Sequence, residues 1–232
     1  MVWLVGLALL FVAFSLPLVI VFSRRDWRTW QWWLAAATGG VGLFITLSAQ
    51  PPLQIAYSRL TARLMSGPLL TRLMISFGVV LISGLVQELL KILAPAVLTR
   101  VTPSSRSGAI ALGAASGTGF GVVEAIKLVA LPLAALHVAP ALALWERAAV
   151  VTFHCATGAY LGAGVARGRG VRAYLAAALL HGLLNFSVIL QSYMLLDPVG
   201  LELWVSAGAI IAVAMALRAR EAAIPARSGG GG

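Results

Sequence analysis

Eight strongly polar side chains interrupt the long apolar segments of this 232-residue chain. They are Gln87, Glu88, Lys91, Glu124, Lys127, His154, His181 and Asn185. A charged side chain at the centre of a bilayer costs from about 2.5 to more than 10 kcal/mol, so such residues usually face one another or a wet cavity. We therefore expect these side chains to converge on one polar site.

The spacing of these residues supports a shared site. Glu88 and Lys91 are three positions apart, and His181 and Asn185 are four positions apart. Residues at these separations lie on one face of a helix. Counted from the expected helix ends at a rise of about 1.5 Å per residue, the glutamates, the histidines and Asn185 lie roughly 15–24 Å from the same membrane face. Antiparallel helices thus bring their polar residues to a similar depth.

The residue types suit hydrolysis of an amide bond. A carboxylate in a cavity of low dielectric constant can take a proton from water and later donate it, and neighbouring histidines can orient that water. An asparagine amide can stabilise a developing oxyanion, a contribution worth about 10²–10³ in rate. Two histidines and a glutamate also form a common ligand set for catalytic zinc, here Glu124, His154 and His181, although the short HExxH spacing is absent. A metal-free mechanism and a zinc mechanism both stay open, and the cofactor is unknown.

The same residues have purely structural interpretations. Glu88 with Lys91, or Glu124 with Lys127, can form an ion pair along one helix that neutralises itself for insertion. Lys127 can instead extend its ammonium group to the membrane surface. An intramembrane histidine often joins two helices through a hydrogen bond.

The composition indicates a membrane protein. Hydrophobic residues make up 60% of the chain, charged residues make up 10%, and the mean hydropathy is +0.96. Soluble domains carry about 25% charged residues. The net charge of +10 would suit nucleic-acid binding, but the basic residues lie in short clusters between apolar runs, which is the pattern of membrane topology. The single Cys155 excludes an intrachain disulfide and a CxxC metal site.

We expect an all-α polytopic protein with about seven membrane spans, each of about 20 residues or more. The expected spans are 2–23, 31–50, 70–98, 108–131, 141–166, 171–195 and 199–217. The Pro-bounded segment 51–68 predicts a loop with a short interfacial helix. Residues 1–226 then form a single transmembrane domain, and 227–232 form a flexible tail or a remnant of cloning.

The arginines predict the orientation of the chain. They concentrate after the first, third and fifth spans and at the C-terminus. By the positive-inside rule the N-terminus lies outside and the C-terminus in the cytoplasm, in the inner or plasma membrane of a cell.

Glycines recur every four residues in two of the expected spans. They are Gly113, Gly117 and Gly121 in 108–131, and Gly158 and Gly162 in 141–166. Small residues at this spacing let helix backbones approach closely in lipid. We expect these two spans to pack tightly and to build a rigid wall for the site.

Four short motifs occur in order along the chain: QELLK (87–91), FGVVE (120–124), a mid-helix His154, and HGLLN (181–185). This order resembles the PrsW and YhfC branch of the intramembrane protease superfamily, which includes the prenyl-protein (CAAX) endopeptidases. The resemblance covers a core of about residues 80–190. The Glu146-Arg147 pair, which by itself suggests an interfacial ion pair, also looks like the YhfC branch.

The resemblance implies an intramembrane endopeptidase that acts on a membrane-anchored protein or peptide. The implied site residues are Glu88, Glu124, His154, His181 and Asn185, supported by Gln87, Lys91 and Phe120. By the resemblance, Glu88 belongs to the water-activating motif and Lys91 takes its basic position. The two histidines would stabilise the tetrahedral intermediate or bind a metal, and Asn185 would donate on the oxyanion side.

One position departs from this pattern. The family has two adjacent glutamates in its first motif, whereas this chain has Gln87 before Glu88. A glutamine can neither act as a general base nor bind a metal as a carboxylate does. The anterior-pharynx-defective scaffold subunit of gamma-secretase is similar here, with a glutamine-glutamate pair, a GxGFG stretch like residues 117–121 and two intramembrane histidines. This second similarity implies an alternative function, a non-catalytic scaffold that binds a membrane partner subunit.

Transport of protons or a small solute is a third alternative, because intramembrane acids and histidines also build relays. The chain shows none of the repeat halves that many transporters have.

Overall fold

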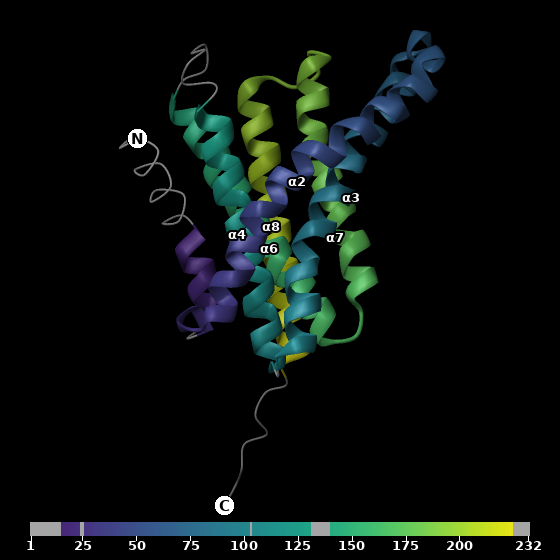
Figure 1. Cartoon of the computed structure of the whole chain (residues 1–232). Helices are drawn as coiled ribbons and strands as arrows, with labels where there is room; N and C mark the ends of the chain where they lie inside the picture. Colours follow the sequence, from purple (N-terminus) through teal and green to yellow (C-terminus); the bar gives the residue numbers. More distant parts are fainter. Residues whose placement is uncertain (1–14, 24–25, 103, 131–139, 225–232) are drawn as a thin grey trace, which may run out of the picture.

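The computed structural model describes residues 15–23, 26–102, 104–130 and 140–224, and these residues are almost entirely helical. Six long helices form the bundle shown in Figure 1. They are α2 (Trp30–Thr61), α3 (Leu69–Val101), α4 (Arg106–Ala130), α6 (Pro140–Ala166), α7 (Gly170–Ser192) and α8 (Pro198–Ala223). Two short 3₁₀ helices, η1 (Asp26–Arg28) and η2 (Ala62–Ser66), flank α2.

All six long helices are apolar and long enough to cross a bilayer. On their outer faces these helices expose many large hydrophobic side chains, such as Ile210 and Leu70. Exposing so much apolar surface to water would be unfavourable. The chain is therefore a polytopic membrane protein. The five expected spans from 70–98 onward correspond to α3, α4, α6, α7 and α8. Most of the expected ends differ from the observed ends by only a few residues. Of the expected first span, residues 15–23 are helical and the rest lies outside the described residues.

The expected loop at 51–68 is largely a helix. α2 continues through Pro51 and Pro52 to Thr61, and only then changes to η2. A proline removes one backbone donor and crowds the carbonyl four residues earlier, which is why the pair suggested the end of a span. In lipid, however, a broken helix would leave several backbone groups without partners, so continuing the helix costs less. The ends of α2 and α3 extend together beyond the other helices, at the upper right of Figure 1.

The expected close packing of α4 against α6 is present. A Cβ atom at Gly113 would overlap the backbone carbonyl of Gly158, and one at Gly117 would overlap the carbonyl of His154. The reverse also holds, since a Cβ at Gly162 would overlap the carbonyl of Ala109. Because the backbones touch, α6 holds His154 directly against α4.

Glycines also bring the other helices of the site together. A Cβ at Gly84 on α3 would overlap the carbonyl of Ala178 on α7, and a Cβ at Gly119 on α4 would overlap the carbonyl of Ala36 on α2. The approach at Gly84 sets the separation of α3 from α7, and the approach at Gly119 sets that of α4 from α2. The close approach of α3 to α7 places Glu88 within hydrogen-bonding distance of His181.

Replacing Gly117 with alanine should lower the stability of the protein by about 1–3 kcal/mol, because the added methyl group must push the two backbones apart. Gly108→Ala is a matched control, since a Cβ there meets only ordinary contacts with Ser104 and Ser105. Thermal unfolding of both variants in detergent tests the prediction. Equal melting temperatures for the two variants would show that α4 and α6 do not pack as closely as described.

Candidate active site

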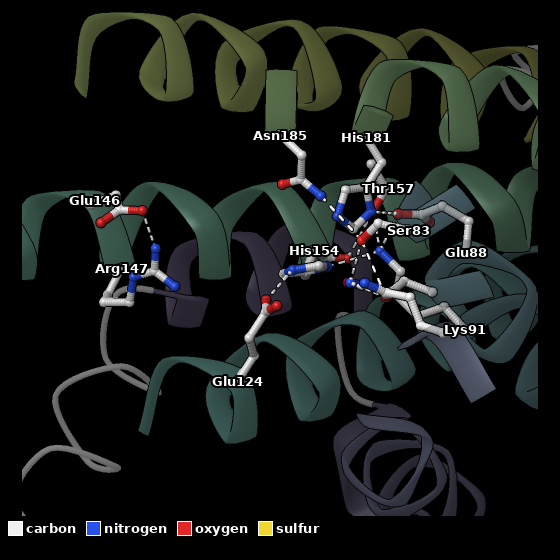
Figure 2. A network of polar contacts seen from close by, with 12 residues as sticks. Ser83, Glu88, Lys91, Glu124, Glu146, Arg147, His154, Thr157, His181 and Asn185 are labelled. Atoms are coloured by element: carbon white, nitrogen blue, oxygen red, sulfur yellow. Dashed lines mark hydrogen bonds and ion pairs between the residues drawn. The ribbon is translucent and has the colours of Figure 1, made fainter. Parts of the chain in front are cut away.

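Glu88 belongs to a buried network of charged and polar residues (Figure 2). Its side chain is completely buried. One carboxylate oxygen, Oε1, accepts hydrogen bonds from Lys91 Nζ at 2.5 Å and from His181 Nδ1 at 2.7 Å. Since Nδ1 of His181 donates to the carboxylate, the lone pair of the neutral imidazole is on Nε2.

Lys91 links Glu88 to the neighbouring helix α6. Its ammonium group also donates to His154 Nδ1 at 2.9 Å and to Thr157 Oγ1 at 2.8 Å. All three hydrogens of the ammonium group thus have an acceptor. The rings of Phe120 and Phe153 enclose the ammonium, with centroids 5.7 and 5.8 Å from Nζ. A buried lysine with this many partners is held rigidly in place.

His154 connects Lys91 to the second glutamate. Because an ammonium can only donate, Nδ1 of His154 must accept, and the ring proton is on Nε2. Nε2 then donates to Glu124 Oε2 at 2.7 Å. The centroid of the Phe120 ring lies 5.1 Å from that of the His154 imidazole, so Phe120 packs against the network. The network runs continuously from Glu124 to His181 across four helices.

A second, uncharged network lies beside the first and contains the other two expected residues. Gln87 Nε2 donates to Ser83 Oγ at 2.9 Å and to Gln50 Oε1 at 3.2 Å. Asn185 Nδ2 donates to the same Ser83 Oγ at 3.3 Å. Gln87 and Asn185 therefore meet at a serine on α3. Gln87 acts as a donor toward α2, a role that a carboxylate could not fill.

Two acceptors, one in each network, have no hydrogen-bond partner among the described residues. They are Glu88 Oε2 and Gln87 Oε1, and both are buried. A buried polar atom without a partner is rare in native proteins and requires an explanation, such as a bound water molecule. The lone pairs of Glu88 Oε2 are thus free to accept a proton.

The residues that could hold a metal differ from the expected set. Ligand atoms of Glu88, His154 and His181 all lie within 4.8 Å of one another. Glu124 instead bonds to Nε2 of His154, whereas Lys91 contacts the opposite nitrogen, Nδ1, of the same ring. The ammonium group of Lys91 bonds to both Glu88 Oε1 and His154 Nδ1, so a metal ion would have to displace it. In this arrangement the residues fit an internal ammonium ion better than a metal.

Sequence reasoning missed three polar residues of the two networks, Gln50, Ser83 and Thr157. One signal was available, because Ser83 precedes Gln87 by four positions and so lies on the same face of α3. Two other expected features lie outside the networks. Lys127 makes no ion pair with a described residue, and Glu146 pairs only with its neighbour Arg147.

No family model, curated protein or solved structure matches this chain. The resemblance to intramembrane proteases therefore stays an interpretation of four short motifs. The geometry of the two networks carries the functional argument.

Proposed function

We propose that the protein is a PrsW-like intramembrane endopeptidase that hydrolyses a peptide bond in a membrane-associated substrate. One observation carries the proposal. Glu88 has one oxygen fixed by Lys91 and His181 while its other oxygen is buried without a partner among the described residues. An oriented carboxylate with free lone pairs, next to histidines, is what general-base activation of water requires.

In the proposed reaction, a water molecule gives one proton to Glu88 Oε2 while its oxygen attacks the carbonyl carbon of the substrate. The new C–O bond converts the carbonyl oxygen to an oxyanion. Collapse of this intermediate breaks the C–N bond, and the proton on Glu88 passes to the leaving amine. The amide of Asn185 is on the helix that faces Glu88, and its second N–H stabilises the oxyanion. His181, on the same helix, orients the carboxylate of Glu88 through its Nδ1–H.

Lys91 and Glu124 have positioning roles in this proposal. Lys91 fixes the carboxylate of Glu88, and Glu124 fixes the tautomer of His154. No step uses a metal ion, because Lys91 supplies the positive charge between Glu88 and His154. Gln87 does not act as a second general base. It donates to Ser83 and Gln50 and so shapes the pocket beside Glu88.

We also propose seven spans in the inner or plasma membrane, with the N-terminus outside and the C-terminus in the cytoplasm. The connections α3–α4 and α6–α7 and the end of α8 lie together at the lower end of the bundle in Figure 1. Arg100, Arg106, Arg167, Arg169, Arg172, Arg218 and Arg220 all lie near that end. The positive-inside rule assigns such an end to the cytoplasm.

A non-catalytic scaffold is the second candidate, and the burial of the network favours it. Glu88 and Lys91 are fully buried and pair with each other, as expected if they only fix the packing of the helices. In that case substitutions in the network should reduce binding of a membrane partner and leave substrate proteins intact.

The two candidates are separated by the membrane proteins that are cleaved in cells. Membranes from cells that produce the wild-type protein should contain new protein termini that are absent when His181→Ala is produced at equal level. Mass spectrometry of the termini identifies the substrate, and the same products should form when zinc chelators are present. Identical protein termini in the wild-type and His181→Ala membranes would contradict the proposed endopeptidase activity.

A further inference from the structure

A large cavity lies at the basic end of the bundle, away from the buried networks. Its volume is about 890 Å³, and residues from the end of α3, the end of α6 and the start of α7 line it. We propose that this cavity binds a phosphate group, as carried by the headgroup of an anionic phospholipid. The binding site is distinct from the proposed function and does not depend on it.

Four arginines converge on this cavity from three segments. Arg100 comes from the last turn of α3, Arg167 and Arg169 from the α6–α7 turn, and Arg172 from the first turn of α7. No acidic residue lines the cavity. Within the described part of the chain, none of the four guanidinium groups makes a hydrogen bond or ion pair. Like charges gathered without a counter-charge repel one another, and a bound phosphate would relieve that repulsion.

The α6–α7 turn fixes two of these arginines and adds backbone donors. Gly168 has a φ angle of 66°, which favours glycine, and Arg169 N donates to Gly164 O at 2.8 Å to close the turn. The N-cap residue of α7, Arg169, makes no side-chain capping bond. The first backbone bond of α7 is from Ala173 N to Arg169 O, so the N–H groups of residues 170–172, which line the cavity, have no backbone partner among the described residues. Free N–H groups and the helix dipole at this position favour an anion.

The rest of the lining indicates a lipid. Ile92, Ala96, Val165 and Val171 give the cavity apolar walls beside its arginines. Val171 is 73% exposed, and Val97 and Val101 on the neighbouring face of α3 are 52% and 67% exposed, so an acyl chain can lie along this face. The positive-inside rule explains why arginines lie at this end of the bundle but not why four of them surround one cavity. Basic pockets between membrane helices at this level are typical sites for anionic lipid headgroups.

The test is the thermal unfolding of the delipidated full-length protein in detergent, titrated with phosphatidylglycerol, phosphatidylcholine or inorganic phosphate. Phosphatidylglycerol should raise the melting temperature, and Arg169→Gln/Arg172→Gln should weaken its apparent affinity by about tenfold or more. The matched control is Arg218→Gln/Arg220→Gln, which removes the same charge at the same end of the bundle from residues that do not line the cavity. If the double variant in the turn fails to fold, Arg100→Gln on α3 tests the same cavity.

The outcomes identify the source of the bound phosphate, and they also test whether the cavity binds phosphate at all. A response to phosphatidylglycerol alone supports a lipid headgroup, whereas an equal response to inorganic phosphate supports a soluble phosphate compound. The proposal is overturned if neither anion shifts the melting temperature. It is also overturned if the control variant weakens binding as much as the cavity variants, because the effect would then be diffuse attraction to a basic surface.

Discussion

Glu88→Gln should reduce the rate of peptide-bond cleavage by roughly 10²–10⁴-fold, which is the contribution of general-base catalysis. Glutamine has nearly the same shape as glutamate but cannot take a proton from water. The initial rate of product formation from a membrane-anchored substrate in proteoliposomes measures the loss. Glu202→Gln is the control, since Glu202 is also buried but lies on α8 outside the two networks.

Loss of activity in Glu88→Gln could also follow from loss of structure, because the substitution leaves the ammonium of Lys91 without its counter-charge. The double variant Glu88→Gln/Lys91→Met removes both charges and should recover much of the lost stability. Its cleavage rate should stay as low as that of the single variant. Recovery of cleavage in the double variant would show that Glu88 is a structural residue and not the base.

Lys91→Met should lower the free energy of unfolding by about 3–5 kcal/mol, which is typical of removing one partner from a buried ion pair. Methionine fills a similar volume but leaves Glu88 charged and buried, and it leaves His154 and Thr157 without their donor. Unfolding by heat or denaturant in detergent micelles measures the change.

The control for Lys91→Met is Lys127→Met on α4. Lys127 is half-buried and pairs with no acid among the described residues, so its loss should change stability by only about 0.5 kcal/mol. Similar stabilities of the two variants would mean that the ammonium of Lys91 does not hold the network together.

The sequence predicted most helices well because long apolar runs and arginine clusters mark membrane spans directly. It failed at 51–61, where two prolines suggested the end of a helix that in fact continues. The error had a consequence at the site. Gln50 is the last residue of the expected span 31–50, and it was not included among the site residues, although it accepts hydrogen bonds from Ser83 and Gln87 on α3.

Convergence of the glutamates and histidines could be predicted from their similar depth, but their pairing could not. Depth along a helix follows from counting residues, whereas the direction of a side chain around the helix depends on how neighbouring helices cross. The expected ligand set therefore grouped Glu124 with both histidines. The close approach of α3 to α7 at Gly84 decides that Glu88, and not Glu124, bonds to His181.

The small polar residues were missed for a different reason. Serine and threonine are common in membrane helices, where they usually bond to the backbone carbonyl one turn earlier. Nothing in the sequence distinguishes Thr157, which accepts from Lys91, from Thr99, which donates to the carbonyl of Pro95. Such roles become visible only when the packing of the helices is known.

We propose that Glu88 activates a water molecule inside the membrane to hydrolyse a peptide bond. The most direct test is cleavage of the identified substrate by the purified protein in water enriched in ¹⁸O, followed by mass spectrometry of the products. With the wild-type protein the new C-terminal carboxylate should gain one ¹⁸O atom, and Glu88→Gln should give almost no product. Folded wild-type protein that yields no product, or a Glu88→Gln variant that cleaves at the wild-type rate, would contradict the account.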